Sequence, residues 1–218
     1  MNSNVSRAAH IFAITSVLIV VLIWSGYLVS TSARRRMDEL SRKLAARATH
    51  ETLTGLPNRD LFYDRLSQSI SAARRKRQRI AVFYMDLDGF KAVNDTYSHH
   101  VGDATLREVA RRFRANVREM DTVARLGGDE FTVIMPIIDS LEAAGIVAGR
   151  IIKALTEPFD LSGRQGQVSA SIGISLLPAQ ADNANQLLHN ADVAMYHAKR
   201  QGKANFQFYA PDLEAHVQ

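Results

Sequence analysis

Residues 122–135 read TVARLGGDEFTVIM, and this stretch decides the fold. Two short apolar segments, Thr122–Leu126 and Glu130–Met135, flank the turn Gly127-Gly128-Asp129. Glycines between two apolar runs are typical of a tight β-hairpin. The stretch therefore predicts an antiparallel strand pair that carries Asp129 and Glu130 at its tip.

The segments around this hairpin alternate between strand and helix patterns. Residues 80–87 (IAVFYMDL) are a short apolar run typical of a buried strand, and residues 167–176 (QVSASIGISL) alternate like a strand. Apolar residues recur at helical spacing from residue 57 to the basic run at 73–79, from Asp103 to Val117, and over 141–155 and 185–199. The element order predicts an α/β (α+β) sandwich with a ferredoxin-like or palm-type βαββαβ core and helices on one face.

The composition excludes several kinds of protein. The chain of 218 residues has no cysteine, which rules out a disulfide framework, a thiolate nucleophile and a Cys-ligated metal. Its net charge of +5 lies in residues 1–50, which hold seven Lys or Arg and two Asp or Glu, whereas residues 51–218 hold twenty of each sign. A nucleic-acid-binding domain normally carries excess positive charge on its own surface, so nucleic acid is not an expected partner.

The first part of the chain carries a candidate membrane span. Residues 11–29 (IFAITSVLIVVLIWSGYLV) contain no charge and would cover roughly 28 Å as a helix, close to the hydrocarbon thickness of a bilayer. We predict a short N-terminal segment over 1–10 and a transmembrane helix over 11–30. The alternative is a cleaved signal peptide with Thr31-Ser32-Ala33 at the cleavage site, but the apolar run is long for one.

Basic residues follow this span and set its expected orientation. Arg7 alone precedes it, whereas six basic residues lie within 34–47, so a single-pass anchor in the inner membrane would place the C-terminal domain in the cytoplasm. Residues 31–50 read as a basic juxtamembrane linker helix that pairs with its copy in a dimer. A solvated basic linker attracted to anionic lipid is the alternative.

Acidic residues stand at two strand ends. Asp86 and Asp88 end the apolar strand and point the same way on an extended backbone, and Asp129 and Glu130 sit at the hairpin tip. Hard cations such as Mg²⁺ take oxygen ligands and leave positions for substrate phosphates. With lysines to neutralise phosphate, this set suggests metal-assisted phosphoryl or nucleotidyl transfer; solvated acids and a plain turn are the alternative. The candidate lysines are Lys91, Lys199 and Lys203.

Six motifs resemble one known family. Residues 125–131 (RLGGDEF) resemble the signature of the GGDEF family, the diguanylate cyclases. The resemblance covers residues 51 to about 210, which we therefore expect to form a GGDEF domain, with a tail at 211–218. The further motifs, in chain order, are 53–59 (LTGLPNR), 86–95 (DLDGFKAVND), Gly102-Asp103, 171–174 (SIGI) and 191–202 (ADVAMYHAKRQG).

The resemblance implies an activity, a cofactor and an assembly. The family condenses two GTP molecules into cyclic di-GMP and releases two pyrophosphates, with two domains face to face as a homodimer and one GTP in each. It implies Mg²⁺ or Mn²⁺ ligated by Asp86, Asp129, Glu130 and the Leu87 carbonyl. Glu130 would hold the second metal or help deprotonate the attacking 3′-hydroxyl.

The resemblance also implies substrate contacts. Asn94 and Asp103 would bind the guanine, and Lys91, Lys199 and Lys203 would contact or neutralise the phosphates. The glycines at 127 and 128 would let the triphosphate lie against the backbone.

One further motif concerns regulation. Arg118 and Asp121 form an RxxD six residues before Gly127, an offset that resembles the family's inhibitory site for its product. The alternative is that Arg118 only caps the C-terminal end of its helix.

The sequence departs from the family pattern at four positions. Glu51 replaces Asp, Ser98 and His100 replace Gly and Asp, and Lys203 replaces Arg. Glycine at position 98 would permit an unusual backbone angle, so the loop before Asp103 is the segment that these changes affect most.

Two alternative functions remain. The domain could be a catalytically silent module that binds cyclic di-GMP, GTP or a partner protein in signalling. It could also be a GTP-binding regulatory domain for a phosphodiesterase, because residues 206–218 resemble the connector that precedes a phosphodiesterase domain in tandem proteins.

Overall fold

The computed structural model describes residues 49–160, 163, 165–178 and 183–216, together with Trp24 and Met37. The chain divides into residues 1–48 and 49–218, and the second unit contains all the elements described below. The predicted transmembrane helix and most of the linker helix lie outside the described residues. Within the described part of the chain, no helix is long and apolar enough to cross a membrane.

A five-stranded sheet with strand order β2-β3-β1-β6-β7 forms the centre of the domain. The first four strands are antiparallel to their neighbours, and β7 runs parallel to β6 at one edge. The elements are α2 (Arg59–Lys76), β1 (Arg79–Asp88), α3 (Phe90–Tyr97), α4 (His99–Ala115), β2 (Thr122–Gly127), β3 (Glu130–Ile138), α5 (Leu141–Thr156), β4 (Phe159–Asp160), β5 (Gln165–Gly166), β6 (Ser169–Leu177), α6 (Ala184–Arg200), β7 (Phe206–Phe208) and the 3₁₀ helix η1 (Pro211–His216).

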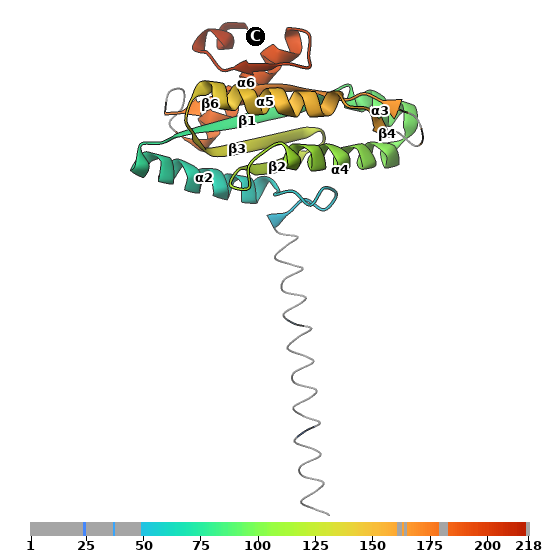
Figure 1. The fold of residues 1–218 in the computed structure, drawn as a ribbon, viewed down its shortest axis with the longest axis horizontal. Coiled ribbons are helices and arrows are strands. Elements are labelled where there is room, and N and C mark those ends of the chain that lie inside the picture. The colour runs from blue at the N-terminus through green and yellow to red at the C-terminus, as the bar shows by residue number, and fades with distance from the viewer. Residues whose placement is uncertain are drawn as a thin grey trace, which may run out of the picture. The chain divides into compact units, whose positions relative to one another are not determined.

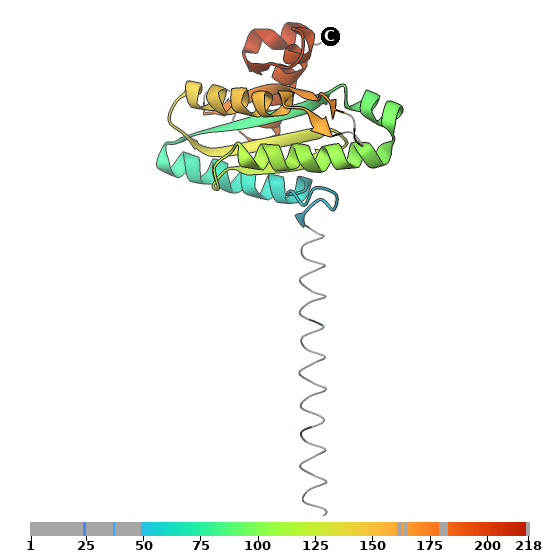
Figure 2. The same cartoon turned by 45° about the vertical axis from the view of Figure 1, so that its right-hand side comes forward.

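The predicted ferredoxin-like core is confirmed, and the strands run between layers of helices (Figures 1 and 2). The helices that belong to the βαββαβ core, α4 and α5, pack with α3 on one face of the sheet. The prediction of helices on one face is wrong for the domain as a whole, because α2 and α6 cover the other face. The physical reason is that these flanking helices each carry an apolar stripe that must also be buried.

Strand β1 is apolar on both faces because both faces are covered. Phe83 and Met85 pack toward α4 and α5, whereas Val82 and Tyr84 pack toward α2 and α6. A strand buried on both sides reads as a continuous apolar run, which explains the sequence of residues 80–85.

Helix α6 lies unusually close to the sheet at Gly173 of β6. A Cβ at this position would lie 1.8 Å from the Ala191 carbonyl oxygen and 2.2 Å from the Met195 backbone nitrogen. The glycine in the SIGI strand therefore permits the close approach that brings the C-terminal half of α6, with Lys199, toward the end of β1.

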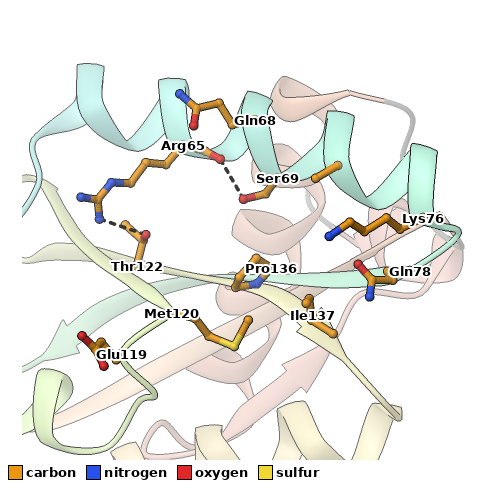
Figure 3. Close-up of a pocket in the computed structure, with 11 residues that line it drawn as sticks. Arg65, Gln68, Ser69, Lys76, Gln78, Glu119, Met120, Thr122, Pro136 and Ile137 are labelled. Carbon is orange, nitrogen blue, oxygen red and sulfur yellow. Dashed lines mark hydrogen bonds between the residues drawn. The ribbon is translucent and has the colours of Figure 1, made fainter.

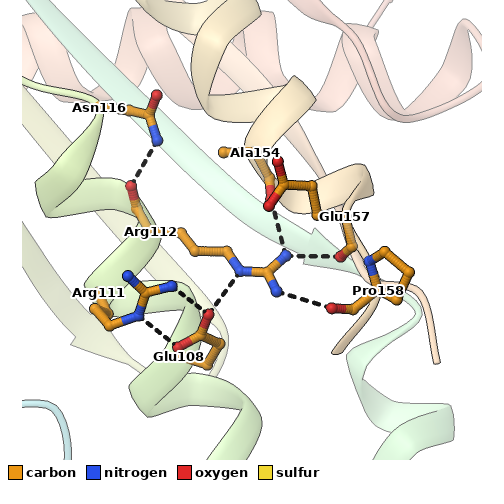
Figure 4. Close-up of polar contacts among 7 residues, drawn as sticks. All are labelled: Glu108, Arg111, Arg112, Asn116, Ala154, Glu157 and Pro158. Carbon is orange, nitrogen blue, oxygen red and sulfur yellow. Dashed lines mark hydrogen bonds and ion pairs between the residues drawn. The ribbon is translucent and has the colours of Figure 1, made fainter. Parts of the chain in front are cut away.

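A buried arginine joins α4 to the end of α5 (Figure 4). The Arg112 guanidinium donates to the carbonyl oxygens of Ala154, Glu157 and Pro158 at 2.7–2.9 Å and to the Glu108 carboxylate at 2.9 Å. It also lies 3.8 Å from the centroid of the Phe159 ring. The carbonyl oxygens at the C-terminal end of a helix have no donor within the helix, and the Arg112 guanidinium supplies one. In return, these acceptors pair the N–H groups of the buried guanidinium.

Several element boundaries differ from the sequence predictions. Helix α4 begins at His99 rather than Asp103, and the structure adds the helix α3, which the sequence analysis did not predict. The short strands β4, β5 and β7 were also missed, since two or three residues carry no usable periodicity. Helix α2 begins at Arg59, because the Asn58 side chain accepts a hydrogen bond from the Leu61 N–H and caps it.

Candidate active site

Acidic residues gather where β1 ends and β3 begins. Because these strands are antiparallel neighbours, Asp86 lies directly opposite Glu130. The Leu87 N–H donates to the Asp129 carbonyl oxygen at 3.3 Å, so the hairpin tip is fastened to the end of β1. The topology thus brings together acids that are more than 40 positions apart in the sequence.

Lys199 of α6 provides the positive charge at this cluster. Its Nζ lies 2.8 Å from Asp86 Oδ1. Burial raises the pKa of Asp86, and the negative charges of Asp129 and Asp88 raise it further, whereas Lys199 lowers it. The site therefore concentrates negative charge that one lysine only partly compensates.

The donor set of this cluster suits a hard divalent cation. Asp86, Asp129 and Glu130 offer carboxylate oxygens, which Mg²⁺ and Mn²⁺ prefer, and the uncompensated charge favours a cation. No three described His, Asp or Glu side chains converge closely enough to hold a metal ion as they stand, and Lys199 lies against Asp86. The side chains have the chemistry that the ion requires. For Asp86 to bind the ion, Lys199 would first have to release its carboxylate.

Asp88 has a structural role that the sequence did not suggest. Its carboxylate accepts from the hydroxyls of Ser169 and Ser171 at 2.8 Å and from the Ala204 N–H at 3.0 Å. It shares a face with Asp86, as predicted, but it anchors the loop that carries Lys203.

Tyr84 is a residue that the sequence analysis missed. Burial of its hydroxyl, together with the negative charge of Glu130, raises the pKa of Tyr84 above its usual range. Because a tyrosine within an apolar strand reads as core, only the register of β1 against β3 places this residue near the acid.

The predicted guanine-binding residues meet where α3 packs against α4. Asn94 lies over Gly102: a Cβ on Gly102 would lie 1.9 Å from Asn94 Oδ1, so only glycine leaves room for this amide. Asp103 follows in the same turn of α4, and both side chains are half-buried. The structure therefore places the two residues on adjoining turns of two packed helices.

Ser98 joins these two helices in a strained conformation. Its φ of 141° lies in a region that L-residues rarely adopt and glycine tolerates. The expectation that position 98 requires an unusual backbone angle is confirmed, and serine adopts it here.

The hairpin turn is held by a buried arginine. Gly127 and Gly128 have φ values of 152° and 51°, which explains the pair of glycines. Arg125 Nε and Nη2 donate to the Gly128 carbonyl oxygen at 3.0 and 2.7 Å, and its Nη1 lies 2.9 Å from Glu51 Oε2. The start of the domain is thus linked through one side chain to the turn between β2 and β3.

Glu51 makes several further hydrogen bonds at the start of the domain. Its carboxylate accepts from the Leu53 and Thr54 N–H groups at 2.7 and 2.9 Å and from the Thr54 hydroxyl at 2.7 Å. Burial raises the pKa of Glu51, but these hydrogen bonds and the Arg125 contact outweigh it and lower the pKa to about 2.

The three predicted lysines have different surroundings. Lys199 reaches Asp86, whereas the side chains of Lys91 and Lys203 are exposed. Lys91 lies in the first turn of α3, directly after β1, and Lys203 adopts a φ of 63° in the loop that Asp88 holds.

The RxxD residues lie in the turn between α4 and β2. Asp121 is 9% exposed and accepts from the Arg118 N–H at 2.9 Å, while the Arg118 side chain is exposed. Burial raises the pKa of Asp121, and the charges of Arg118 and Arg150 oppose this. Both residues line a pocket of about 270 Å³ whose rim also carries Arg65 and Arg114.

A second groove, of about 480 Å³, runs beside it between α2 and strands β2 and β3 (Figure 3). Arg65 and Glu119 line both pockets, and Arg65 Nη1 donates to the Thr122 hydroxyl at 3.1 Å. The acids of the β1–β3 rim do not line this groove.

Comparisons with known proteins agree on one family. The family described as "Diguanylate cyclase, GGDEF domain" matches residues 48–205. Among Pseudomonas aeruginosa proteins, the bifunctional diguanylate cyclase/cyclic di-GMP phosphodiesterase MucR is 48% identical over 178 residues, which are 82% of this chain and 26% of MucR. The diguanylate cyclase TpbB is 43% identical over 175 residues, 80% of this chain and 40% of TpbB. The chain thus spans about a quarter to two fifths of these relatives.

Solved structures agree with the fold. The GGDEF domain of TpbB from Pseudomonas aeruginosa is 42% identical with a TM-score of 0.76, covering 78% of this chain and 99% of that one. The coiled coil and GGDEF domain of DgcB from Caulobacter crescentus, in complex with c-di-GMP, is 25% identical with a TM-score of 0.77, covering 85% of this chain and 98% of that one.

Proposed function

The chain belongs to the GGDEF domain family of diguanylate cyclases, and from this premise we propose that it condenses two GTP molecules into cyclic di-GMP with release of two pyrophosphates. The observation that carries the proposal is the pairing of Asp86 with Glu130 across β1 and β3, with Asp129 fastened to Leu87. All the acids of the family signature are present at one rim.

The proposed reaction joins two domains that face each other in a homodimer. Each domain holds one GTP, and the 3′-hydroxyl oxygen of one attacks the α-phosphorus of the other. A new oxygen–phosphorus bond forms, the bond to the β-phosphate breaks, and pyrophosphate leaves. Two such steps close the ring, and Glu130 would hold the second metal or help to remove the hydroxyl proton.

Mg²⁺ or Mn²⁺, held by Asp86, Asp129, Glu130 and the Leu87 carbonyl, would neutralise the charge that develops on the phosphates. Lys199 would exchange its contact with Asp86 for a phosphate oxygen, since a lysine ammonium pairs with either anion. Lys91 and Lys203, both exposed near the end of β1, would contact the remaining phosphates. The glycine turn, held by Arg125, presents bare backbone to the triphosphate.

Asn94 and Asp103 would recognise the base. A carboxylate accepts from the N–H groups of guanine, and an amide can both donate and accept along the same edge. Gly102 supports this assignment, because its missing side chain leaves room for the Asn94 amide.

Product inhibition through Arg118 and Asp121 is part of the proposal. The pocket of about 270 Å³ on which both residues border, with Arg65 and Arg114 at its rim, suits an anionic guanine nucleotide. We expect Arg118→Ala to relieve inhibition by added cyclic di-GMP while the uninhibited rate stays unchanged. Identical inhibition curves for both proteins would restrict Arg118 to the end of its turn.

We further propose a single-pass anchor in the inner membrane with the domain in the cytoplasm, in contact with the lipid bilayer. This proposal is supported by the uncharged residues 11–29 and the basic residues after them. A reporter fused after Gln218 is expected to be active on the cytoplasmic side; periplasmic alkaline phosphatase activity would contradict it.

A silent signalling module is the second candidate function. The proteins at this level of similarity include a cyclic di-GMP phosphodiesterase, NbdA of Pseudomonas aeruginosa, 36% identical over 82% of this chain. The intact acids favour a cyclase. The deciding experiment incubates the chain with GTP and Mg²⁺ and measures cyclic di-GMP, with Glu130→Ala as the control; turnover in neither protein would leave the binding module as the function.

A further inference from the structure

Exposed cations gather where α2 ends and β1 begins. They are Arg74, Arg75, Lys76, Arg77 and Arg79. The C-terminal end of a helix favours cations in its last turn, which accounts for the first three, but the run continues beyond the helix. Within the described part of the chain, no ion pair involves Lys76, Arg77 or Arg79.

Arg77 occupies a position at which helices usually have glycine. It follows α2 with φ 53° and ψ 39°, the left-handed conformation. A Cβ makes this conformation unfavourable, which is why glycine is the usual residue there. The chain therefore places a charge at this point against the preference of its backbone, and such a residue suggests a functional use.

An apolar pocket of about 360 Å³ lies beside this run, where β1 begins and where β3 and β6 end. Its lining residues are Arg79, Ile138, Leu141, Leu176, Leu177 and Pro178. Arg79 belongs to both features, because it is the last cation of the run and pairs with Ile138 across β1 and β3. The volume falls within the range of ligand sites, about 300–1,000 Å³. We call the run and the pocket together the basic–apolar surface.

The charge of this surface is positive in a domain that is otherwise balanced. Residues 51–218 hold equal numbers of acidic and basic residues, yet the five cations of the run face only two acids next to the pocket residues in sequence. Those acids are Asp139 and Glu142, which follow Ile138 and Leu141. The complement of this surface is therefore an anionic partner that also offers an apolar side chain.

The shape of the pocket favours a protein segment over a membrane. A bilayer surface is broad and receives apolar side chains that protrude from a protein. Here Ile138, Leu176 and Leu177 are buried walls of a hollow, and only Leu141 is largely exposed, at 48%. A hollow of this kind is filled by a side chain that the partner supplies.

A second copy of this chain does not match the run of cations. No six consecutive residues of the sequence hold more than two acids, so the chain has no acidic segment of comparable charge density. The charges and the pocket therefore indicate a different protein as the occupant.

From this arrangement we propose that the basic–apolar surface docks an acidic segment of a partner protein, with an apolar side chain of that segment in the pocket and its carboxylates against the cations. The inference goes beyond the proposed function and does not depend on it. Arg79 and Asp86 lie at opposite ends of β1, roughly 23 Å apart for seven residues of extended strand. Docking here therefore leaves the acidic rim open to substrate.

Three labelled peptides of equal length test the proposal by fluorescence anisotropy. The first alternates glutamate and serine around a central phenylalanine–leucine pair, the second replaces this pair by two alanines, and the third replaces the glutamates by glutamines. The full chain is held in phosphatidylcholine nanodiscs, whose headgroups have no net charge. We expect the first peptide to bind at least about ten-fold more tightly than either of the others, and its affinity to fall as salt is added.

Two variants of the chain test the two halves of the surface. One combines Arg75→Gln, Lys76→Gln and Arg77→Asn, since asparagine tolerates the left-handed backbone. The other is Leu141→Gln, at the pocket. Because all four side chains are exposed, both proteins should fold, and each should weaken binding of the first peptide about ten-fold.

Matched controls change exposed residues outside the surface. Arg107→Gln together with Arg111→Gln removes cations from α4, and Ile146→Gln removes an apolar side chain of α5 that is 63% exposed. Both proteins should bind the first peptide as wild type does. Every variant should make cyclic di-GMP at the wild-type rate.

The outcomes separate this proposal from the proposed function. Equal binding of the three peptides, no binding of the first, or unchanged binding in the Leu141→Gln protein would overturn the docking surface while leaving the cyclase intact. Phosphatidylserine vesicles that bind wild type but not the triple variant, with no preference among the peptides, would assign the surface to a membrane and also overturn it. A wild-type chain that binds the first peptide selectively but makes no cyclic di-GMP would overturn the activity and support the docking surface.

Discussion

Glu51 offers a direct test of how the start of the domain is fastened to the β2–β3 hairpin. The perturbation is Glu51→Gln, which keeps the size of the side chain and removes its charge. Glutamine has one acceptor oxygen, whereas the carboxylate accepts from Leu53, Thr54 and Arg125. The substitution therefore leaves donors unsatisfied and Arg125 without its counter-charge.

The size of the effect follows from the pKa of Glu51. Lowering this pKa from 4.5 to about 2 corresponds to about 3 kcal/mol of folding free energy that the ionised form contributes. The Glu51 side chain is 21% exposed, so solvent screening removes only part of this. Because glutamine keeps one acceptor, we expect the free energy of unfolding to fall by about 2 kcal/mol at pH 7.

The pH dependence has a definite sign. The folded-state pKa of Glu51 lies below its unfolded-state value, so its contribution is complete above about pH 4.5 and is lost as the pH falls toward about 2. The difference in stability between wild type and Glu51→Gln should therefore be largest at neutral pH and shrink below about pH 4.5.

Urea unfolding of both proteins between pH 7 and pH 3 measures this difference. The matched control is Glu119→Gln, an exposed glutamate that should change the stability by less than about 0.5 kcal/mol. A Glu51→Gln protein as stable as wild type at pH 7, or a difference that grows on acidification, would refute the reasoning.

Three further substitutions test other parts of the structure. Arg112→Met leaves three carbonyl oxygens of the α5 end without a donor and should lower the free energy of unfolding by about 3 kcal/mol in a urea titration. Its matched control is the exposed Arg111→Met, which should leave the free energy of unfolding nearly unchanged in the same titration. Ser98→Gly relieves a φ of 141° and should stabilise the protein by about 1 kcal/mol in thermal unfolding; a loss of stability would show that the backbone there is not strained. Gly102→Ala would push Asn94 aside and should raise the KM for GTP about ten-fold. The control is Gly149→Ala, whose added methyl group meets open space and should leave the KM unchanged. An unchanged KM in Gly102→Ala would contradict a role for Asn94 in guanine binding.

The fold class could be predicted because the pattern of elements is local. The apolar run at 80–87 and the glycine turn at 127–128 are both visible along the chain, and the structure confirms a strand and a hairpin there. The short helix α3 could not be found, because eight residues with two buried positions carry too little periodicity. The second helical layer was missed because the sequence shows which face of α6 is apolar but not which side of the sheet it covers.

The sequence alone determined the residue types of the site. The sequence motifs identify Asp86, Asp129 and Glu130 as candidate site residues. Their carboxylates indicate binding of a cation and of phosphates, whatever the fold. Only the tertiary structure decided which side chains meet. The antiparallel register of β1 and β3 sets Asp86 opposite Glu130, and the close approach of α6 at Gly173 brings Lys199 to Asp86. Contacts between residues far apart in the chain depend on strand register and helix packing, which are set by the packing of the whole core rather than by any local pattern.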